Sequence, residues 1–172
     1  MKRIYLLLAI VSATILSSCE GPQGVPGQDG TNVQAEVFEL LNVDFNYDSQ
    51  IGYNIYQSLN PQIYDSDVIM IYRLSGTIDT QTPIWQSIPR TLYLNQGELD
   101  YDFDFSKEDF TIYAGGNFDI AMTPNYLNNQ TFRIVIIPGY FSNKGNVTVD
   151  LNDYNAVIKA YHIDDSKIKR LN

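Results

Sequence analysis

Apolar and polar residues alternate along short segments of this chain, and that alternation restricts it to folds built from β-sheets. The clearest segment is Leu99–Phe105, LDYDFDF, in which every second side chain is aromatic or aliphatic. Successive side chains of a strand point to opposite faces of a sheet. The segment therefore predicts a strand with one buried face and one face in water. A helix would distribute the same residues around its axis and leave no continuous apolar side.

Two further segments, Asp67–Leu74 and Thr131–Ile137, are apolar without alternation, as expected of central strands that are covered on both faces. Pro89 separates two candidate strands and indicates a bulge or a sheet edge at that point. The other candidate strands are Ala35–Phe45, Gly52–Tyr56, Ile84–Ile88, Arg90–Leu94, Phe110–Ala114 and Asn146–Val149. Short strands separated by turn residues predict a mainly β domain over residues 31–172, an antiparallel β-sandwich of about eight strands.

The hydrophobic period changes near the C-terminus. One helical face collects Leu151, Tyr154, Val157, Ile158 and Tyr161. Asp150 or Asn152 precedes them as an N-cap residue, so we expect a short C-terminal helix that covers an open edge or end of the sandwich. We expect Asp165–Leu171 to add a further turn or two of helix.

The first residues have the pattern of a secretory signal. Lys2 and Arg3 precede an apolar run, Ile4–Leu16, and two serines then stand before Cys19. The run is shorter than the roughly 20 apolar residues of a spanning helix. Cys19 is the only cysteine, so the chain has no intramolecular disulfide.

The segment Leu16-Ser17-Ser18-Cys19 resembles the lipobox of bacterial lipoproteins. This resemblance implies that residues 1–18 are a removed signal peptide and that Cys19 becomes the acylated N-terminus. Acyl chains attach a protein to lipid without a spanning helix, because each buried CH₂ contributes about 0.8 kcal/mol. The expected partner is membrane lipid, and the expected location is the cell envelope, at the periplasmic or surface face of the outer membrane. The alternative is a plain signal peptide with Cys19 near its cleavage site.

Residues 19–30 combine Cys19 with a short collagen-like run, in which glycine recurs at every third position from Gly21 to Gly30. Together with the lipobox, this run resembles a group of bacterial lipoproteins described as collagen-like. The resemblance covers residues 1–30 and implies no biochemical activity. We expect an extended tether rather than a triple helix, because three triplets are too few to hold three chains together. Trimerisation through the run is the alternative.

The net charge of the chain limits the kinds of partner that it can bind. Removal of residues 1–18 takes away two basic residues, which leaves 9 basic against 20 acidic side chains and a net charge of −11. Such a chain repels phosphate, so we exclude nucleic acid as a partner. We expect an envelope protein or a glycan as the partner. No motif indicates a cofactor.

Three carboxylates at alternate positions, Asp100, Asp102 and Asp104, suggest a calcium loop. However, Phe105 and Thr111 stand where the EF-hand pattern needs a glycine and a carboxylate. The simpler interpretation is a strand with its acidic side in water, which discourages edge-to-edge pairing. Calcium binding by the three aspartates is the alternative.

Catalytic signals are weak. His162 is the only histidine, and no Gly-x-Ser-x-Gly element accompanies it, so we expect a surface or capping histidine. The candidate sugar-binding aromatics are Trp85, Tyr93, Tyr113, Tyr126 and Tyr140, of which we select Trp85 and Tyr126 as ligand-binding residues. Aromatics on strands more often pack in a core. The polar loop Asn125–Gln130 is the best candidate ligand loop. We therefore expect a non-catalytic binding or structural module of the cell envelope; the alternatives are a small carbohydrate-active enzyme, which needs two converging carboxylates, and a calcium-dependent adhesion domain.

Overall fold

The computed structural model describes residues 35–139 and 149–172. They belong to one compact unit, Asn32–Asn172. The signal peptide, Cys19, the glycine triplets and most of the expected strand Asn146–Val149 lie outside the described residues; Val149 itself is not in a strand.

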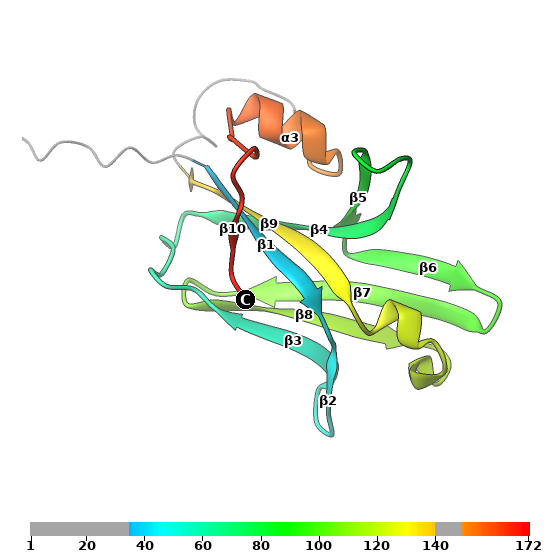
Figure 1. The fold of residues 1–172 in the computed structure, drawn as a ribbon. Helices are drawn as coiled ribbons and strands as arrows, with labels where there is room; N and C mark the ends of the chain where they lie inside the picture. The colour runs from blue at the N-terminus through cyan, green and yellow to red at the C-terminus, as the bar shows by residue number, and fades with distance from the viewer. Residues whose placement is uncertain (1–34, 140–148) are drawn as a thin grey trace, which may run out of the picture. The chain divides into compact units, whose positions relative to one another are not determined.

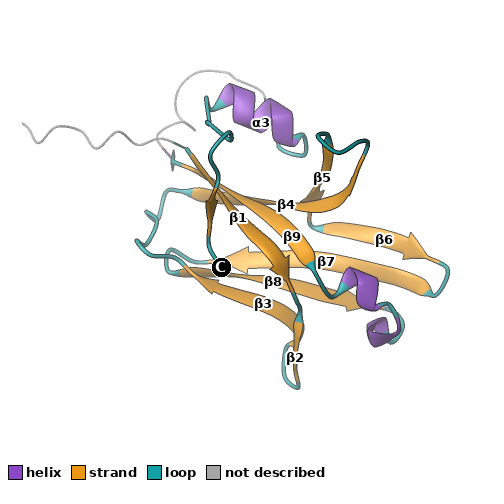
Figure 2. Cartoon of the chain, in the orientation of Figure 1, coloured by secondary structure: helices purple, strands orange, loops and turns teal. Residues whose placement is uncertain are grey.

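The described chain forms two five-stranded sheets that face each other (Figures 1 and 2). Sheet A consists, in spatial order, of β10 (Lys169–Arg170), β1 (Glu36–Val43), β9 (Gln130–Ile137), β4 (Val68–Thr77) and β5 (Pro83–Ile88). Sheet B consists of β2 (Asn46–Asp48), β3 (Gly52–Ser58), β8 (Asp109–Gly116), β7 (Gly97–Phe105) and β6 (Arg90–Leu94). All pairs are antiparallel except β1 with β10. The predicted antiparallel sandwich is thus confirmed.

The main core lies between the sheets. Strands of sheet A contribute Leu40, Ile71 and Phe132 to it, and strands of sheet B contribute Leu99 and Phe110, all of them buried. Burying a side chain of this size stabilises the fold by roughly 1.5–3 kcal/mol. Pro89 stands between β5 and β6, which are edge strands of different sheets. The prediction of a sheet edge at Pro89 is therefore confirmed.

A second core lies on the other face of sheet A, beneath the helix α3 (Tyr154–Ala160). Tyr72 and Val135 of the sheet pack in one cluster with Tyr154 and Val157 of the helix. Figure 2 shows α3 over this face of sheet A. Sheet A is therefore covered on both faces, which explains why β9 and the start of β4 are apolar without alternation. Among the described residues, no helix is long and apolar enough to cross a membrane.

Two details at the C-terminus differ from expectation. The N-cap of α3 is Asp153, whose carboxylate accepts hydrogen bonds from the backbone N–H groups of Asn155 and Ala156 at 2.9 and 3.2 Å, so neither Asp150 nor Asn152 has this role. The expected further helix over Asp165–Leu171 is wrong. Its last part is β10, which pairs in parallel with the free edge of β1.

The alternation in β7 holds only over its first half. Leu99 and Tyr101 are buried, whereas Phe103 is half-buried and Phe105 is 41% exposed. The reason is pairing length: β6 accompanies β7 only from Gly97 to Tyr101. Beyond that point β7 pairs with β8 alone and its other side is open, so an acidic, solvent-facing side suits this part of the strand.

Candidate functional site

A hollow of about 400 Å³ opens at one end of the domain. It lies where the turn between β6 and β7 meets two short 3₁₀ helices, η1 (Ile120–Met122) and η2 (Pro124–Tyr126), which Figure 2 shows beside that turn. The residues that line it are Tyr93, Leu94, Asn95, Gln96, Met122, Thr123, Pro124, Asn125 and Tyr126. We refer to this space as the hollow.

The lining of the hollow is uncharged. It combines the phenol rings of Tyr93 and Tyr126 with amide side chains at Asn95, Gln96 and Asn125. None of the described residues that line it is acidic or basic, although the whole chain has a net charge of −9. Aromatic faces with a few polar groups are typical of sites for small organic ligands.

The turn on one side of the hollow has a fixed geometry. Asn95 and Gln96 form the two-residue connection between β6 and β7, and Gly97 follows with φ +144°. A Cβ atom at Gly97 would collide with the side chain of Asn117, whose Oδ1 accepts a hydrogen bond from the backbone N–H of Glu98 at 2.8 Å. Only glycine fits this backbone conformation, so the backbone of the turn is restricted to one arrangement.

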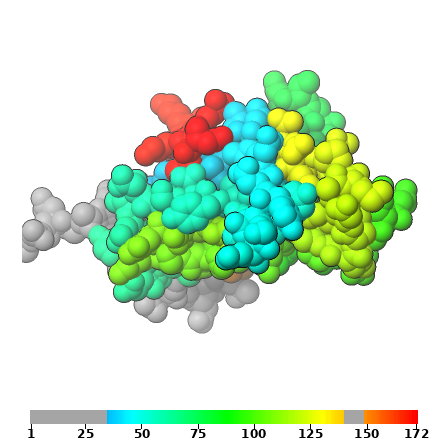
Figure 3. Space-filling view, turned by 90° about the horizontal axis from the view of Figure 1, so that it is seen from below, coloured from blue at the N-terminus to red at the C-terminus, as the bar shows by residue number. Residues whose placement is uncertain are grey.

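The loop of residues 123–128 lies on the other side of the hollow, and each of its backbone carbonyls accepts a hydrogen bond. Within the loop, the Tyr126 N–H donates to Thr123 O at 3.0 Å, and the N–H groups of Leu127 and Asn128 donate to Pro124 O at 3.0 and 2.8 Å. The other carbonyls accept from outside the loop. Leu127 O accepts from the N–H of Phe45 at 2.9 Å, in the segment between β1 and β2. In Figure 3 the surface of the loop (yellow-green) adjoins the surface of this N-terminal segment (cyan).

Side chains of the two sheets bind the remaining carbonyls. The hydroxyl of Tyr101 donates to Tyr126 O at 2.6 Å. The amide nitrogen of Gln130 donates to Asn125 O at 2.9 Å and to Asn128 O at 2.7 Å. Buried partners therefore fix the backbone that carries Asn125 and Tyr126 from below.

Of the predicted site residues, Tyr126 lines the hollow and Trp85 does not. Trp85 is half-buried on the helix-covered face of sheet A and packs against the second core. Tyr126 packs against the main core on the opposite face. The two aromatics therefore do not share a surface. Of the other candidate aromatics, Tyr93 also lines the hollow, Tyr113 does not, and Tyr140 lies outside the described residues. The turn residues Asn95 and Gln96 were not predicted as site residues, because only the fold brings them beside the loop at Asn125.

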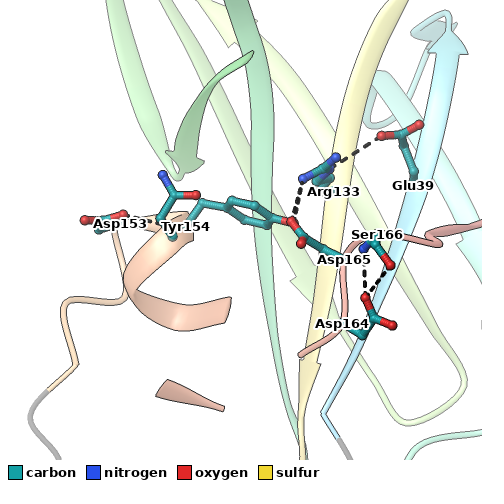
Figure 4. A network of polar contacts seen from close by, with 8 residues as sticks. Glu39, Arg133, Asp153, Tyr154, Asp164, Asp165 and Ser166 are labelled. Atoms are coloured by element: carbon teal, nitrogen blue, oxygen red, sulfur yellow. Dashed lines mark hydrogen bonds and ion pairs between the residues drawn. The ribbon is translucent and has the colours of Figure 1, made fainter. Parts of the chain in front are cut away.

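Arg133 of β9 is the centre of a polar network beneath α3 (Figure 4), and the ring of Trp85 packs against its guanidinium. The guanidinium of Arg133 lies 4.3 Å from the Trp85 ring centre and 5.0 Å from that of Tyr154. It donates to the Tyr154 hydroxyl at 2.6 Å, and that hydroxyl donates to Asp165 at 2.9 Å. Arg133 also makes ion pairs with Asp165 at 3.3 Å and with Glu39 at 3.5 Å. The network joins α3 and the C-terminal segment to sheet A. The face of the Trp85 indole is therefore already covered by a cation of the chain itself.

The three aspartates of β7 do not gather. Asp104 accepts a hydrogen bond from the hydroxyl of Tyr113 at 3.0 Å, and Asp102 accepts one from the backbone of Phe103. In the described ranges, no three side chains of histidine, cysteine, aspartate or glutamate come together as a metal-binding group. His162 is exposed and has φ +53° just after α3, which confirms the expected surface position.

Buried phenols make the domain sensitive to alkali. Burial raises the pKa of Tyr101 to about 12, although the nearby Arg73 acts in the opposite direction. Burial also raises the pKa values of Tyr72 and Tyr154. In the unfolded chain these phenols lose their protons near pH 10, whereas the folded chain retains them.

We therefore expect the free energy of unfolding to fall as pH rises above 10, because the unfolded state then binds fewer protons than the folded one. Tyr101 alone should account for about 3 kcal/mol between pH 10 and 12. Denaturant unfolding at several pH values should show a smaller loss in Tyr101→Phe and an unchanged loss in Tyr93→Phe, since Tyr93 is 81% exposed. Equal losses in the wild type and Tyr101→Phe would contradict this account.

Comparison of the chain with models of protein families, with curated proteins and with solved structures found no match, so its family is not assigned.

Proposed function

We propose that this protein is a lipid-anchored, non-catalytic binding module of the cell envelope, and that the hollow binds an uncharged carbohydrate. The observation that carries the proposal is the lining itself. A strongly acidic chain forms a hollow from tyrosine rings, amides and a hydroxyl, with no charged side chain among the described lining residues.

The chemistry of the lining suits a sugar. The face of a tyrosine ring is electron-rich and packs against the slightly positive C–H groups of a pyranose. Amide side chains offer both donors and acceptors, so Asn95, Gln96 and Asn125 can bond hydroxyl groups in either direction. A charged ligand would lose its hydration in the hollow without gaining an opposite charge from these residues.

The same lining favours binding over hydrolysis. Glycoside hydrolysis needs two carboxyl groups on either side of the scissile bond, and the described lining residues include none. Neither alternative function gains an observation of its own: Asp102 and Asp104 are exposed, Asp100 is half-buried, and none of the three lines the hollow. The anchor rests on the sequence, in which Cys19 follows a signal and lipobox pattern.

A matched pair of polysaccharides tests the ligand class. Full-length protein in detergent is titrated with polygalacturonate and with its fully methylated ester, which has the same backbone without charge. Neutral glucan, mannan and xylan are titrated beside them. We expect saturable binding to one or more neutral polymers, weak dependence on salt, and no binding to polygalacturonate. Preference for the charged polymer, or no binding to any neutral one, would contradict the proposal.

A further inference from the structure

Beneath the hollow lies a buried pair, Arg73 of β4 and Gln130 of β9, which bond each other, and Gln130 also bonds the loop that carries Asn125 and Tyr126. Arg73 is 8% exposed and Gln130 is 5% exposed. The Nε atom of Arg73 donates to Oε1 of Gln130 at 2.8 Å. We infer that Arg73 and Gln130 are positioning residues of the hollow, which hold Asn125 and Tyr126 in the arrangement that receives the ligand. The inference rests on the proposed function of that site.

The amide of Gln130 uses all its hydrogen-bonding groups in one orientation. Its oxygen accepts from Arg73, and its nitrogen donates to the carbonyls of Asn125 and Asn128. A guanidinium can only donate, so Arg73 requires the oxygen to face it. The nitrogen must then face the loop. Arg73 thereby determines which end of the amide meets the two carbonyls, without itself contacting the loop backbone.

Arg73 also contacts the aromatic side of the hollow from below. Its guanidinium carbon lies 4.7 Å from the ring centre of Tyr101 and 5.8 Å from that of Tyr126. Tyr101 in turn donates to Tyr126 O. Gln130 and Tyr101, which both contact Arg73, therefore bind the loop at Asn125, Tyr126 and Asn128, and Arg73 itself supports one of the rings that line the hollow.

Among the described residues, Arg73 forms no ion pair. Both ion pairs found in the part of the chain that the structure describes belong to Arg133. A buried cation without an anionic partner costs stability unless hydrogen bonds and ring faces offset the cost. An apolar residue would fill this place at a lower cost in stability. What Arg73 contributes is therefore its hydrogen bond to Gln130 and its contacts with the two tyrosine rings. A loop that is ordered before binding avoids the entropy cost of ordering at the moment of binding.

The test separates positioning from stability. Gln130→Glu keeps the size of the side chain and an acceptor for Arg73, but it cannot donate to Asn125 O or Asn128 O. We expect amide hydrogen exchange at Tyr126, Leu127 and Asn128 to become at least tenfold faster, with exchange in β3 and β8 unchanged. Affinity for the neutral polymer bound by the wild type should fall about tenfold. Arg73→Met, which frees the amide to turn, should have the same effects, and it replaces Gln130→Glu if that variant does not fold.

The control is Val157→Ala in α3, on the opposite face of sheet A. It should lower overall stability and leave both the exchange of the loop and the affinity as they are in the wild type. Wild-type exchange and affinity in Gln130→Glu would overturn the inference. The exchange measurement needs no ligand, so it decides the positioning role even where the polysaccharide titrations fail and the proposed function falls.

Discussion

Replacement of Cys19 by serine should move the protein from the membrane fraction to the soluble fraction. We propose from the lipobox pattern that the acyl chains are attached to this one residue, and a hydroxyl does not form the thioether that would carry them. A single acyl chain binds reversibly and more than one gives lasting attachment, so losing them all leaves no anchor. The mature chain has a net charge of −11 and does not attract anionic head groups, so no second contact should retain it.

Fractionation of cells and metabolic labelling with a fatty-acid analogue check this expectation. The wild type should incorporate the label and remain with membranes after an alkaline wash. Ser18→Ala, which keeps a small residue before the cysteine, is the matched control and should behave as the wild type. Label on Cys19→Ser, or its retention in washed membranes, would contradict lipid attachment at this residue.

Replacement of Arg133 by methionine should lower the free energy of unfolding by about 2 to 3 kcal/mol. The change removes the cation between Trp85 and Tyr154 and leaves the carboxylate of Glu39 without its partner. The pair with Asp165 contributes less, because that side chain is 37% exposed and water screens it. For a domain of this size, the loss corresponds to a fall in Tm of roughly 5 to 10 °C.

The matched control is Arg90→Met on the edge strand β6, where the arginine is exposed. That variant should change Tm by less than about 2 °C. Hydrogen exchange shows where stability is lost. In Arg133→Met, protection of α3 and β10 should fall more than protection of sheet B. An Arg133→Met variant as stable as Arg90→Met would mean that the network does not hold the C-terminal segment.

The sandwich was predictable because burial imposes a pattern on each strand. The uninterrupted apolar runs of β4 and β9 indicated strands covered on both faces, and the period of the C-terminal segment indicated α3. β10 was not predictable. Its two residues carry no pattern of their own and form a strand only because the edge of β1 is free. The side chain of Asn172 adds to this pairing, since its amide bonds the backbone of Leu41 in both directions.

The candidate site was predictable in part. The amide-rich loop Asn125–Gln130 is a candidate from its composition, and Asn95-Gln96-Gly97 has the composition of a turn. Their juxtaposition arises from sheet topology, which no local pattern encodes. Arg73 was equally hidden, because it lies within an apolar strand and its partner Gln130 is distant in sequence. Trp85 illustrates the opposite case, in which a residue suited to ligand binding is used for internal packing.

One titration tests the central claim most directly, namely that the hollow is the binding site of a carbohydrate-binding module. The neutral polymer that binds the wild type is titrated into Tyr93→Ala and, as a control, into Tyr64→Ala. Both tyrosines are exposed, at 81% and 65%, so neither change should affect folding, and only Tyr93 lines the hollow. We predict a loss of affinity of about tenfold, or about 1.4 kcal/mol, for Tyr93→Ala and none for Tyr64→Ala. Equal affinity in both variants would place the binding site elsewhere and contradict the account.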